Sequence, residues 1–222
     1  RFEIVPDFVG DFLFARLYFG GLTMKKIAVS DITLKIATAQ DISLTFKERL
    51  LIAEKLDASG VDAIELPELI NSKENEVIYR TIASTVKNST VVVPVGSSKE
   101  SLELAYECVK DAKNICLQVA FPVSTVQMEY FYHLKAPAML AKIEEMIKAS
   151  KQICNFVEFV AQDAFRAEEG FVKECVKIAV ESGASIVTVC DDSGEFLFED
   201  YAKIVDEIKS VCDAKVYVQP SN

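Results

Sequence analysis

Polar side chains stand at the carboxyl ends of several predicted β-strands, where reactive residues lie in both α/β barrels and open α/β sheets. Four of them are carboxylates: Asp31, Glu65, Glu158 and Asp191. Carboxylate oxygens gathered at one mouth could bind a hard divalent cation. The same carboxylates could instead form ion pairs with Lys35 and Arg166. The spacing leaves both interpretations open.

Covalent chemistry has one candidate nucleophile, Lys35, because a Schiff base needs an amine desolvated inside the mouth. Lys215 lies at the start of its predicted strand and therefore at the opposite end. We favour the simpler interpretation that Lys35 is solvated or paired with a carboxylate. The single histidine, His133, has no Ser-His-Asp or Cys-His motif around it. One histidine also disfavours a transition-metal site with imidazole ligands.

Short apolar runs alternate with longer amphipathic segments over most of the chain. The predicted strands are 27–30, 63–66, 90–95, 115–120, 155–160, 185–190 and 215–219, and the predicted helices are 46–59, 73–85, 99–113, 137–152, 168–182 and 199–211. Near-continuous Val/Ile runs are typical of parallel strands that are covered on both faces.

This repeat fits either a (β/α) barrel or an open doubly wound sheet. The strand–helix repeat is even, and no Gly-rich loop follows the first strand. Both features favour an α/β fold of the TIM-type barrel over the open sheet. A closed barrel of this type needs eight strands, and the pattern ends at a seventh.

Helix ends carry local signals. Thr45 with Glu48, and Ser97 with Glu100, have the spacing of a capping box. Gly60 and Gly183 follow predicted helices, where a left-handed C-terminal cap favours glycine.

Residues 1–23 do not fit the repeat and form a separate Phe-rich N-terminal extension, either natural or a leader of artificial origin. Phe8, Phe12 and Phe19 follow the spacing of one helix stripe, which predicts an extra N-terminal helix that packs over an open barrel end. Met24 then has the position of a native initiator. Residues 24–222 form the barrel domain, which could be truncated after its seventh strand.

Composition restricts the class of protein. The 222 residues carry a formal net charge of −10, and 50% are hydrophobic. The acidic balance argues against nucleic-acid or membrane-surface partners, and no apolar run is long enough to span a membrane. The six cysteines form no close pair and predict free thiols in a reducing compartment, hence a cytoplasmic protein.

Several segments together resemble one family. The segment Ser30–Lys35 (SDITLK) resembles the opening D-T-T-L-R-D-G-E-Q signature of the DRE-TIM metallolyases. Further stretches resemble its A-G-V-D-x-I-E, F-S-x-E-D-A-x-R and G-A…D-T-x-G motifs, at 59–65, 159–166 and 183–194. This family contains isopropylmalate, homocitrate and citramalate synthases and hydroxymethylglutaryl-CoA lyase. The motifs lie in the family's order over residues 24–222.

The resemblance implies an HMGL-like (β/α)₈ barrel in which a divalent metal polarises an α-keto acid and an arginine stabilises the enolate. The sequence departs from the family at these positions. Lys35 stands where the arginine belongs, Ile36 replaces a metal-binding aspartate, and Gln219 with Ser221 replaces the two histidines of H-x-H-N. Gln127 replaces a substrate-loop histidine of several members. We therefore assign no metal ligand, although Mg²⁺ or Mn²⁺ stays a candidate cofactor.

Two functions compete. In the first, a divergent lyase, aldolase or acyltransferase-like enzyme uses Lys35, Glu65 and Asp191 in catalysis. It binds a small carboxylate or carbonyl compound through Asp31, Thr33, Gln127, Arg166, Thr188 and Gln219. In the second, the chain is a non-catalytic barrel, a pseudoenzyme with a binding or regulatory role. The resemblance also implies a homodimer, because family members commonly dimerise.

Overall fold

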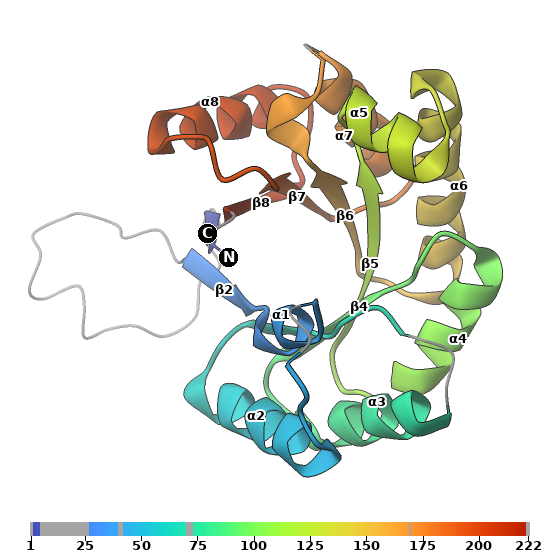
Figure 1. Cartoon of the computed structure of the whole chain (residues 1–222), viewed down its shortest axis with the longest axis vertical. Coiled ribbons are helices and arrows are strands. Elements are labelled where there is room, and N and C mark those ends of the chain that lie inside the picture. Colours follow the sequence, from blue (N-terminus) through green and yellow to red (C-terminus); the bar gives the residue numbers. More distant parts are fainter. Residues whose placement is uncertain (1, 5–26, 40–41, 70–72, 169, 221–222) are drawn as a thin grey trace, which may run out of the picture.

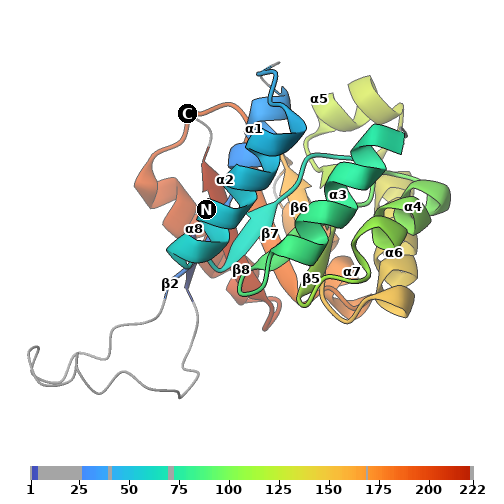
Figure 2. The same ribbon diagram turned by 90° about the horizontal axis from the view of Figure 1, so that it is seen from below.

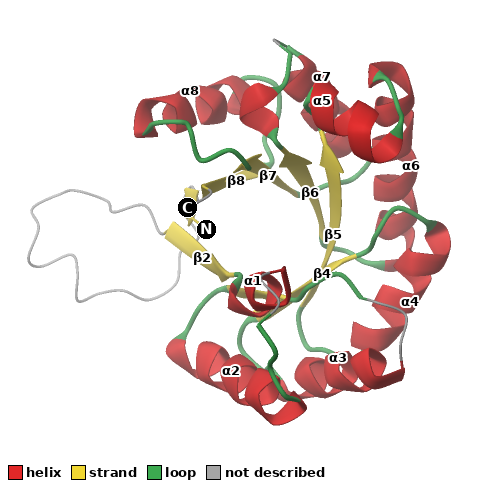
Figure 3. Cartoon of the chain, viewed as in Figure 1, coloured by secondary structure: helices red, strands yellow, loops and turns green. Residues whose placement is uncertain are grey.

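The computed structural model describes residues 2–4, 27–39, 42–69, 73–168 and 170–220. The helix expected over Phe8–Phe19, and Met24 with it, lie outside these residues. The protein is an α/β barrel with its strands inside a ring of helices (Figures 1 and 3). Among the described helices, none combines the length and apolarity needed to cross a membrane.

Seven parallel strands form most of the barrel wall, in sequence order, and confirm the TIM-type fold. They are β2 (Ile27–Asp31), β3 (Ala63–Glu65), β4 (Thr90–Pro94), β5 (Ile115–Pro122), β6 (Val157–Gln162), β7 (Ile186–Asp191) and β8 (Lys215–Pro220). The outer helices are α2 (Phe46–Ser59), α3 (Lys73–Thr85), α4 (Lys99–Val109), α6 (Ala136–Ile153), α7 (Phe171–Glu181) and α8 (Phe198–Lys209).

The eighth wall position is filled by a short strand from the N-terminal extension, β1 (Phe2–Ile4). It pairs antiparallel with β2, with Phe2 opposite Val29, and antiparallel with β8, with Phe2 opposite Val218. The barrel therefore closes through a strand of reversed direction, which the seven-strand repeat of the sequence does not reveal.

Side chains alternate between the two faces of each strand. On β5, Leu117, Val119 and Phe121 belong to the apolar core between the strands and the helices. Gln118 lies between them in sequence and therefore points into the barrel, as does its neighbour in register on β6, Glu158. The interior of the barrel is consequently lined by polar side chains at this level.

Short helical segments cover the carboxyl ends of the strands. They are α1 (Thr33–Ala39), α5 (Thr125–Gln127), the π-helix η2 (Met128–Tyr132) and the 3₁₀-helix η3 (Ala164–Arg166). Figure 2 shows α1 and α5 at the same end of the barrel. None was predicted, because each is too short to show a helical period.

Two helix N-termini test the predicted capping boxes. At α2 the box is confirmed: the Thr45 backbone N–H donates to Glu48 over 2.8 Å, and the Glu48 N–H donates to the Thr45 hydroxyl. At α4 the predicted pair is wrong by one residue. Ser98 is the cap, and its partner three residues later is Ser101. Gly60 has a φ of 84°, as the left-handed cap requires.

A buried carboxylate on α2, Asp57, fixes the loop between α3 and β4. It accepts hydrogen bonds from the backbone N–H groups of Lys87, Asn88 and Ser89 over 2.7–3.0 Å. Desolvation acts to raise the pKa of Asp57, but these donors outweigh it and lower the pKa from 3.8 to about 2. The depressed value means that the ionised carboxylate stabilises the folded chain.

We expect Asp57→Asn to lower the free energy of unfolding at pH 7 by about 2 kcal/mol, because that pKa difference is lost. The contribution is fully present above pH 4 and disappears as the pH falls toward 2, so wild type and variant should converge there. Urea unfolding across this range measures it. Asp111→Asn, on the surface, is the control and should match wild type. An Asp57→Asn deficit that persists unchanged at pH 2 would contradict the assignment.

Candidate active site

The centre of the candidate site is a lysine that reaches from α1 into the barrel. The Nζ atom of Lys35 lies 3.2 Å from Oε2 of Glu65 on β3 and 3.0 Å from Oε1 of Gln118 on β5. Glu65 is fully buried, whereas the Lys35 side chain keeps 29% of its surface exposed. The ammonium group therefore stands at the boundary between the barrel interior and solvent.

Gln118 joins two buried carboxylates. Its Nε2 atom donates to Oε2 of Glu65 and to Oε2 of Glu158, each over 3.0 Å. Both amide protons and the amide oxygen of Gln118 are thus engaged, which sets the orientation of the group. Thr188 on β7 donates to Glu158, and Ser30 on β2 donates to Glu65 over 2.9 Å.

These six residues form one connected interior network, defined here as Ser30, Lys35, Glu65, Gln118, Glu158 and Thr188. All except Lys35 are buried. The register explains how they meet: Gln118 and Glu158 are direct neighbours across β5 and β6, and Thr188 faces the same side on the next strand. Of the predicted site residues, the network brings together Lys35, Glu65 and Thr188.

Asp191 lies on the opposite face of β7, because it is three residues beyond Thr188. It accepts five hydrogen bonds, from Ser193 (two), Gly194, Phe196 and Tyr201, over 2.8–3.4 Å. Desolvation works against the charged form, yet these donors outweigh it and lower the pKa of Asp191. Asp191 thus organises the loop between β7 and α8.

The Tyr201 hydroxyl is one of the donors to the Asp191 carboxylate. Burial first, and then the hydrogen bond to the Asp191 carboxylate, raise the pKa of Tyr201 to about 12. Its ring packs against Phe165 at a centroid distance of 4.7 Å. The contacts of Asp191 and Tyr201 therefore stabilise the loop between β7 and α8, and they are separate from the interior network.

Arg166 is also held locally. Its guanidinium group makes two hydrogen bonds to Asp163, at 2.7 and 2.9 Å, and Asp163 is buried and accepts from Ser124 as well. The hydrogen bond and charge of Asp163 raise the pKa of Arg166. Asp163 has a φ of 55°, a strained left-handed conformation for a residue other than glycine.

The remaining predicted residues are dispersed. Gln127 donates to Asp192 over 3.4 Å, and desolvation first of all raises the pKa of Asp192. Asp31 accepts from the Thr33 backbone N–H over 2.9 Å, a local turn at the start of α1. Gln219 pairs in register with Cys190 at the upper end of β8. None of these three contacts was used in the sequence prediction.

Gln118 received no role in the sequence prediction, and Glu158 was considered there only as a possible cation ligand or ion-pair partner at the mouth. Each interrupts an otherwise apolar strand, in ICLQVAFP and VEFVAQ. A polar residue on a fully covered strand must find a partner inside, and this signal could have identified both.

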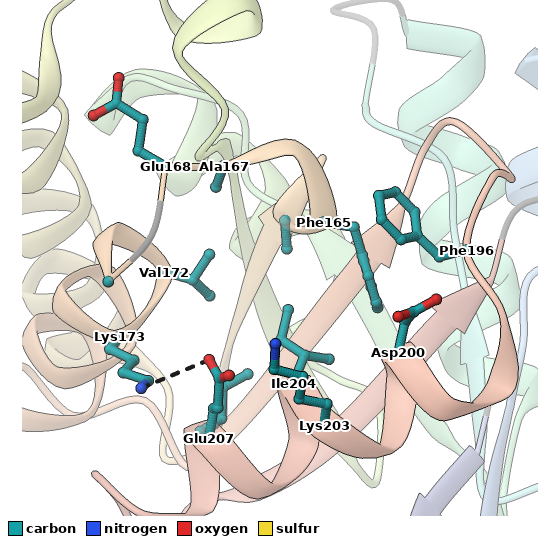
Figure 4. A pocket seen from close by; sticks show the side chains of 13 residues that line it. Phe165, Ala167, Glu168, Val172, Lys173, Phe196, Asp200, Lys203, Ile204 and Glu207 are labelled. Atoms are coloured by element: carbon teal, nitrogen blue, oxygen red, sulfur yellow. Dashed lines mark ion pairs between the residues drawn. The ribbon is translucent and has the colours of Figure 1, made fainter.

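Two cavities border the barrel. One, of about 370 Å³, lies beside β2 and α1 and is lined by Asp31, Thr33 and Ile36 among others. The other, of about 260 Å³, lies between α7 and α8, where Lys173 and Glu207 form an ion pair at 3.6 Å (Figure 4). None of the nine predicted site residues lines this second cavity.

The divalent metal that the family resemblance implies does not fit the residues present. Ile36 has no donor atom, Gln219 offers a neutral amide, and Ser221 lies outside the described residues. Glu65 and Glu158 accept hydrogen bonds from the network. In the part of the chain that the structure describes, no group of three or more His, Cys, Asp or Glu side chains is arranged to hold a metal ion.

Comparison with known proteins points to one family. The HMGL-like family model matches residues 27–220. A 2-isopropylmalate synthase of Staphylococcus aureus (strain JH9) is 31% identical over 163 residues, 73% of this chain, and the match spans about a third (32%) of that enzyme.

Two solved structures share the fold at 12% identity. The hydroxymethylglutaryl-CoA lyase of Pseudomonas aeruginosa aligns with a TM-score of 0.62, over 76% of this chain and 58% of the lyase. The HMG-CoA lyase of Brucella melitensis aligns with a TM-score of 0.63, over 86% of this chain and 70% of the lyase.

Proposed function

Because the chain belongs to the HMGL-like family of synthase and lyase barrels, we propose that its mouth binds a small carboxylate or carbonyl compound without a divalent metal. The position of Lys35 carries this proposal. Lys35 is 29% exposed at the mouth, and described residues accept from it at two points, so that a third N–H can donate to an incoming oxygen. The reaction class would be the making or breaking of a carbon–carbon bond beside a carbonyl.

The supporting geometry is a fixed amine above two buried carboxylates. Glu65 and Gln118 hold Nζ from the interior side, so the remaining N–H faces the mouth from which a ligand would enter. The cavity beside β2 has Asp31 and Thr33 on its wall and borders α1, although Lys35 itself is not among its lining residues. Both features depend on α1, which carries Lys35 over the end of the barrel (Figure 1).

One observation favours a second candidate function, a non-catalytic barrel. Glu65, Gln118, Glu158 and Thr188 are each at most 1% exposed, so they fill the interior at their level. A barrel filled in this way could serve as a binding or regulatory subunit. A homodimer is compatible with either function.

Ligand-observed NMR and calorimetry distinguish the two functions. We expect wild type to bind at least one compound from a panel of pyruvate, glyoxylate, malonate and hydroxyacetone, with and without Mg²⁺. Lys35→Gln should weaken that binding by at least about tenfold, because a charge-assisted hydrogen bond contributes more than 1.4 kcal/mol.

Lys110→Gln is the matched control, since Lys110 forms an exposed pair with Glu107 at 2.7 Å, and it should bind like wild type. Binding that requires Mg²⁺ would contradict the metal-free site. No binding by any compound would favour the non-catalytic barrel.

A further inference from the structure

The Lys35 amine has an unusual partner among the described lysines. Its carboxylate, Glu65, is fully buried, whereas the partners of the other described Lys–Glu pairs are 41–65% exposed. A proton that passes between Lys35 and Glu65 is therefore kept from bulk water on the carboxylate side. An adjacent general base is one way in which a nucleophile is activated, because the base accepts the proton that the attacking amine must lose.

We infer that Lys35 forms a covalent imine with the carbonyl carbon of a small ketone or aldehyde, with Glu65 carrying the protons. This inference rests on the proposed function, because a carbonyl compound must first enter the mouth. It names the reacting atom, Nζ of Lys35, and narrows the ligand class to compounds with a free ketone or aldehyde group.

The step balances in protons and charge. The Lys35 ammonium gives one proton to the Glu65 carboxylate, and the nitrogen lone pair forms a bond to the carbonyl carbon as the C=O π-pair moves to oxygen. This proton and a second one from nitrogen, both passed through Glu65, convert that oxygen into water, and the nitrogen lone pair forms the C=N bond as the C–O bond breaks and water leaves. The product is a protonated imine that keeps one proton on nitrogen, with Glu65 again a carboxylate.

Charge conservation is the physical reason that the buried site tolerates this reaction. An uncompensated buried carboxylate is strongly destabilising. The ammonium and the protonated imine carry the same single positive charge at the same atom, 3.2 Å from Glu65, so Glu65 keeps its counter-charge in reactant and product.

Gln118 completes the geometry. Its oxygen lies 3.0 Å from Nζ, and its amide is locked by the two carboxylates. The amine is thereby held at a fixed point by two acceptors on the interior side, which leaves its third substituent position toward the mouth. After Lys35 has given one proton to Glu65, rotation about its Cε–Nζ bond turns the nitrogen lone pair to that position, where a carbonyl carbon arriving from the mouth would meet it.

Borohydride trapping tests the inference. The full chain is incubated with pyruvate, or separately with hydroxyacetone, and sodium borohydride is added to reduce any imine to a stable secondary amine. Intact mass spectrometry should show one adduct per chain, and peptide mapping should place it at Lys35. Lys35→Arg keeps the positive charge but cannot form the imine, so it should show no specific adduct.

Two further variants sharpen the result. Glu65→Gln can accept a hydrogen bond but cannot carry a proton, and we expect it to slow trapping by about a hundredfold. Lys110→Arg should trap like wild type. If Glu65→Gln fails to fold, Lys35→Arg and the peptide map still decide.

The outcomes separate this inference from the proposed function. Binding by NMR without an adduct overturns the imine and leaves the binding site standing. Labelling that is equal at Lys35 and at Lys110 also overturns it, because the reaction would then be general surface alkylation. No binding and no adduct overturns both proposals.

Discussion

Replacing Gln118 with leucine is expected to lower the free energy of unfolding by about 3–5 kcal/mol, the largest stability effect of any single substitution proposed for this barrel. Gln118 donates to Glu65 and to Glu158 and accepts from Lys35. Leucine can do none of these, so two buried carboxylates lose a donor at once. Equilibrium unfolding in urea measures the change.

Gln152 provides the control, because it is exposed near the end of α6. Gln152→Leu should change stability by less than about 0.5 kcal/mol. A loss below about 1 kcal/mol in Gln118→Leu would mean that water or a rearranged side chain replaces the amide, and the interior network would then not be the determinant of stability at this level.

Replacing Lys35 with methionine is expected to cost about 2 kcal/mol of folding stability, less than the roughly 3–5 kcal/mol of a fully buried pair because Lys35 is 29% exposed. Glu65 would keep its bonds to Ser30 and Gln118 but lose its cation. The same variant should also lose the binding of small carboxylates, since the only network cation is gone.

A double-mutant cycle isolates the contribution that the Lys35–Glu65 interaction makes to the free energy of unfolding. The double variant Lys35→Met/Glu65→Gln removes both charges and keeps an acceptor for Ser30, so it should recover more than half of the stability lost in Lys35→Met. Urea unfolding of wild type, both single variants and the double variant provides the four values. Strictly additive losses would show that the 3.2 Å contact does not contribute to stability.

Much of the wall could be predicted from sequence, because hydrophobic period and caps act locally. The bounds of α2 and α3 agree at both ends with the predicted 46–59 and 73–85, and every parallel strand lies within two residues of its prediction at each end. The N-terminal strand could not be predicted, because its three residues have no partner within their own segment. Its pairing with β2 and β8 is decided by tertiary structure.

The candidate site was predicted less well, because the prediction did not consider which residues of each strand face the inside of the barrel. Asp31 and Glu65, with Glu158 and Asp191, were expected at one mouth. Successive side chains point to opposite faces, and Ser30 rather than Asp31 contacts Glu65. On β7, Thr188 faces inward, and Asp191 is an odd number of residues away. The apolar runs of parallel strands carry no alternation, so only an isolated polar residue within such a run, as Gln118 on β5 and Glu158 on β6, indicates which set faces inward.

The reversed strand β1 places the closure of the barrel beside one part of the interior network and away from the rest. Its pairing with β8 brings together residues near positions 2 and 218, a contact of very high sequence separation, and such contacts carry the greatest loop-closure cost and form slowly. Gln118, Glu158 and Thr188 lie on three consecutive strands away from this seam. We therefore expect the wall that carries Gln118, Glu158 and Thr188 to assemble before the β1–β8 seam closes, whereas Ser30 and Lys35, on and directly after β2, lie at the border of that seam.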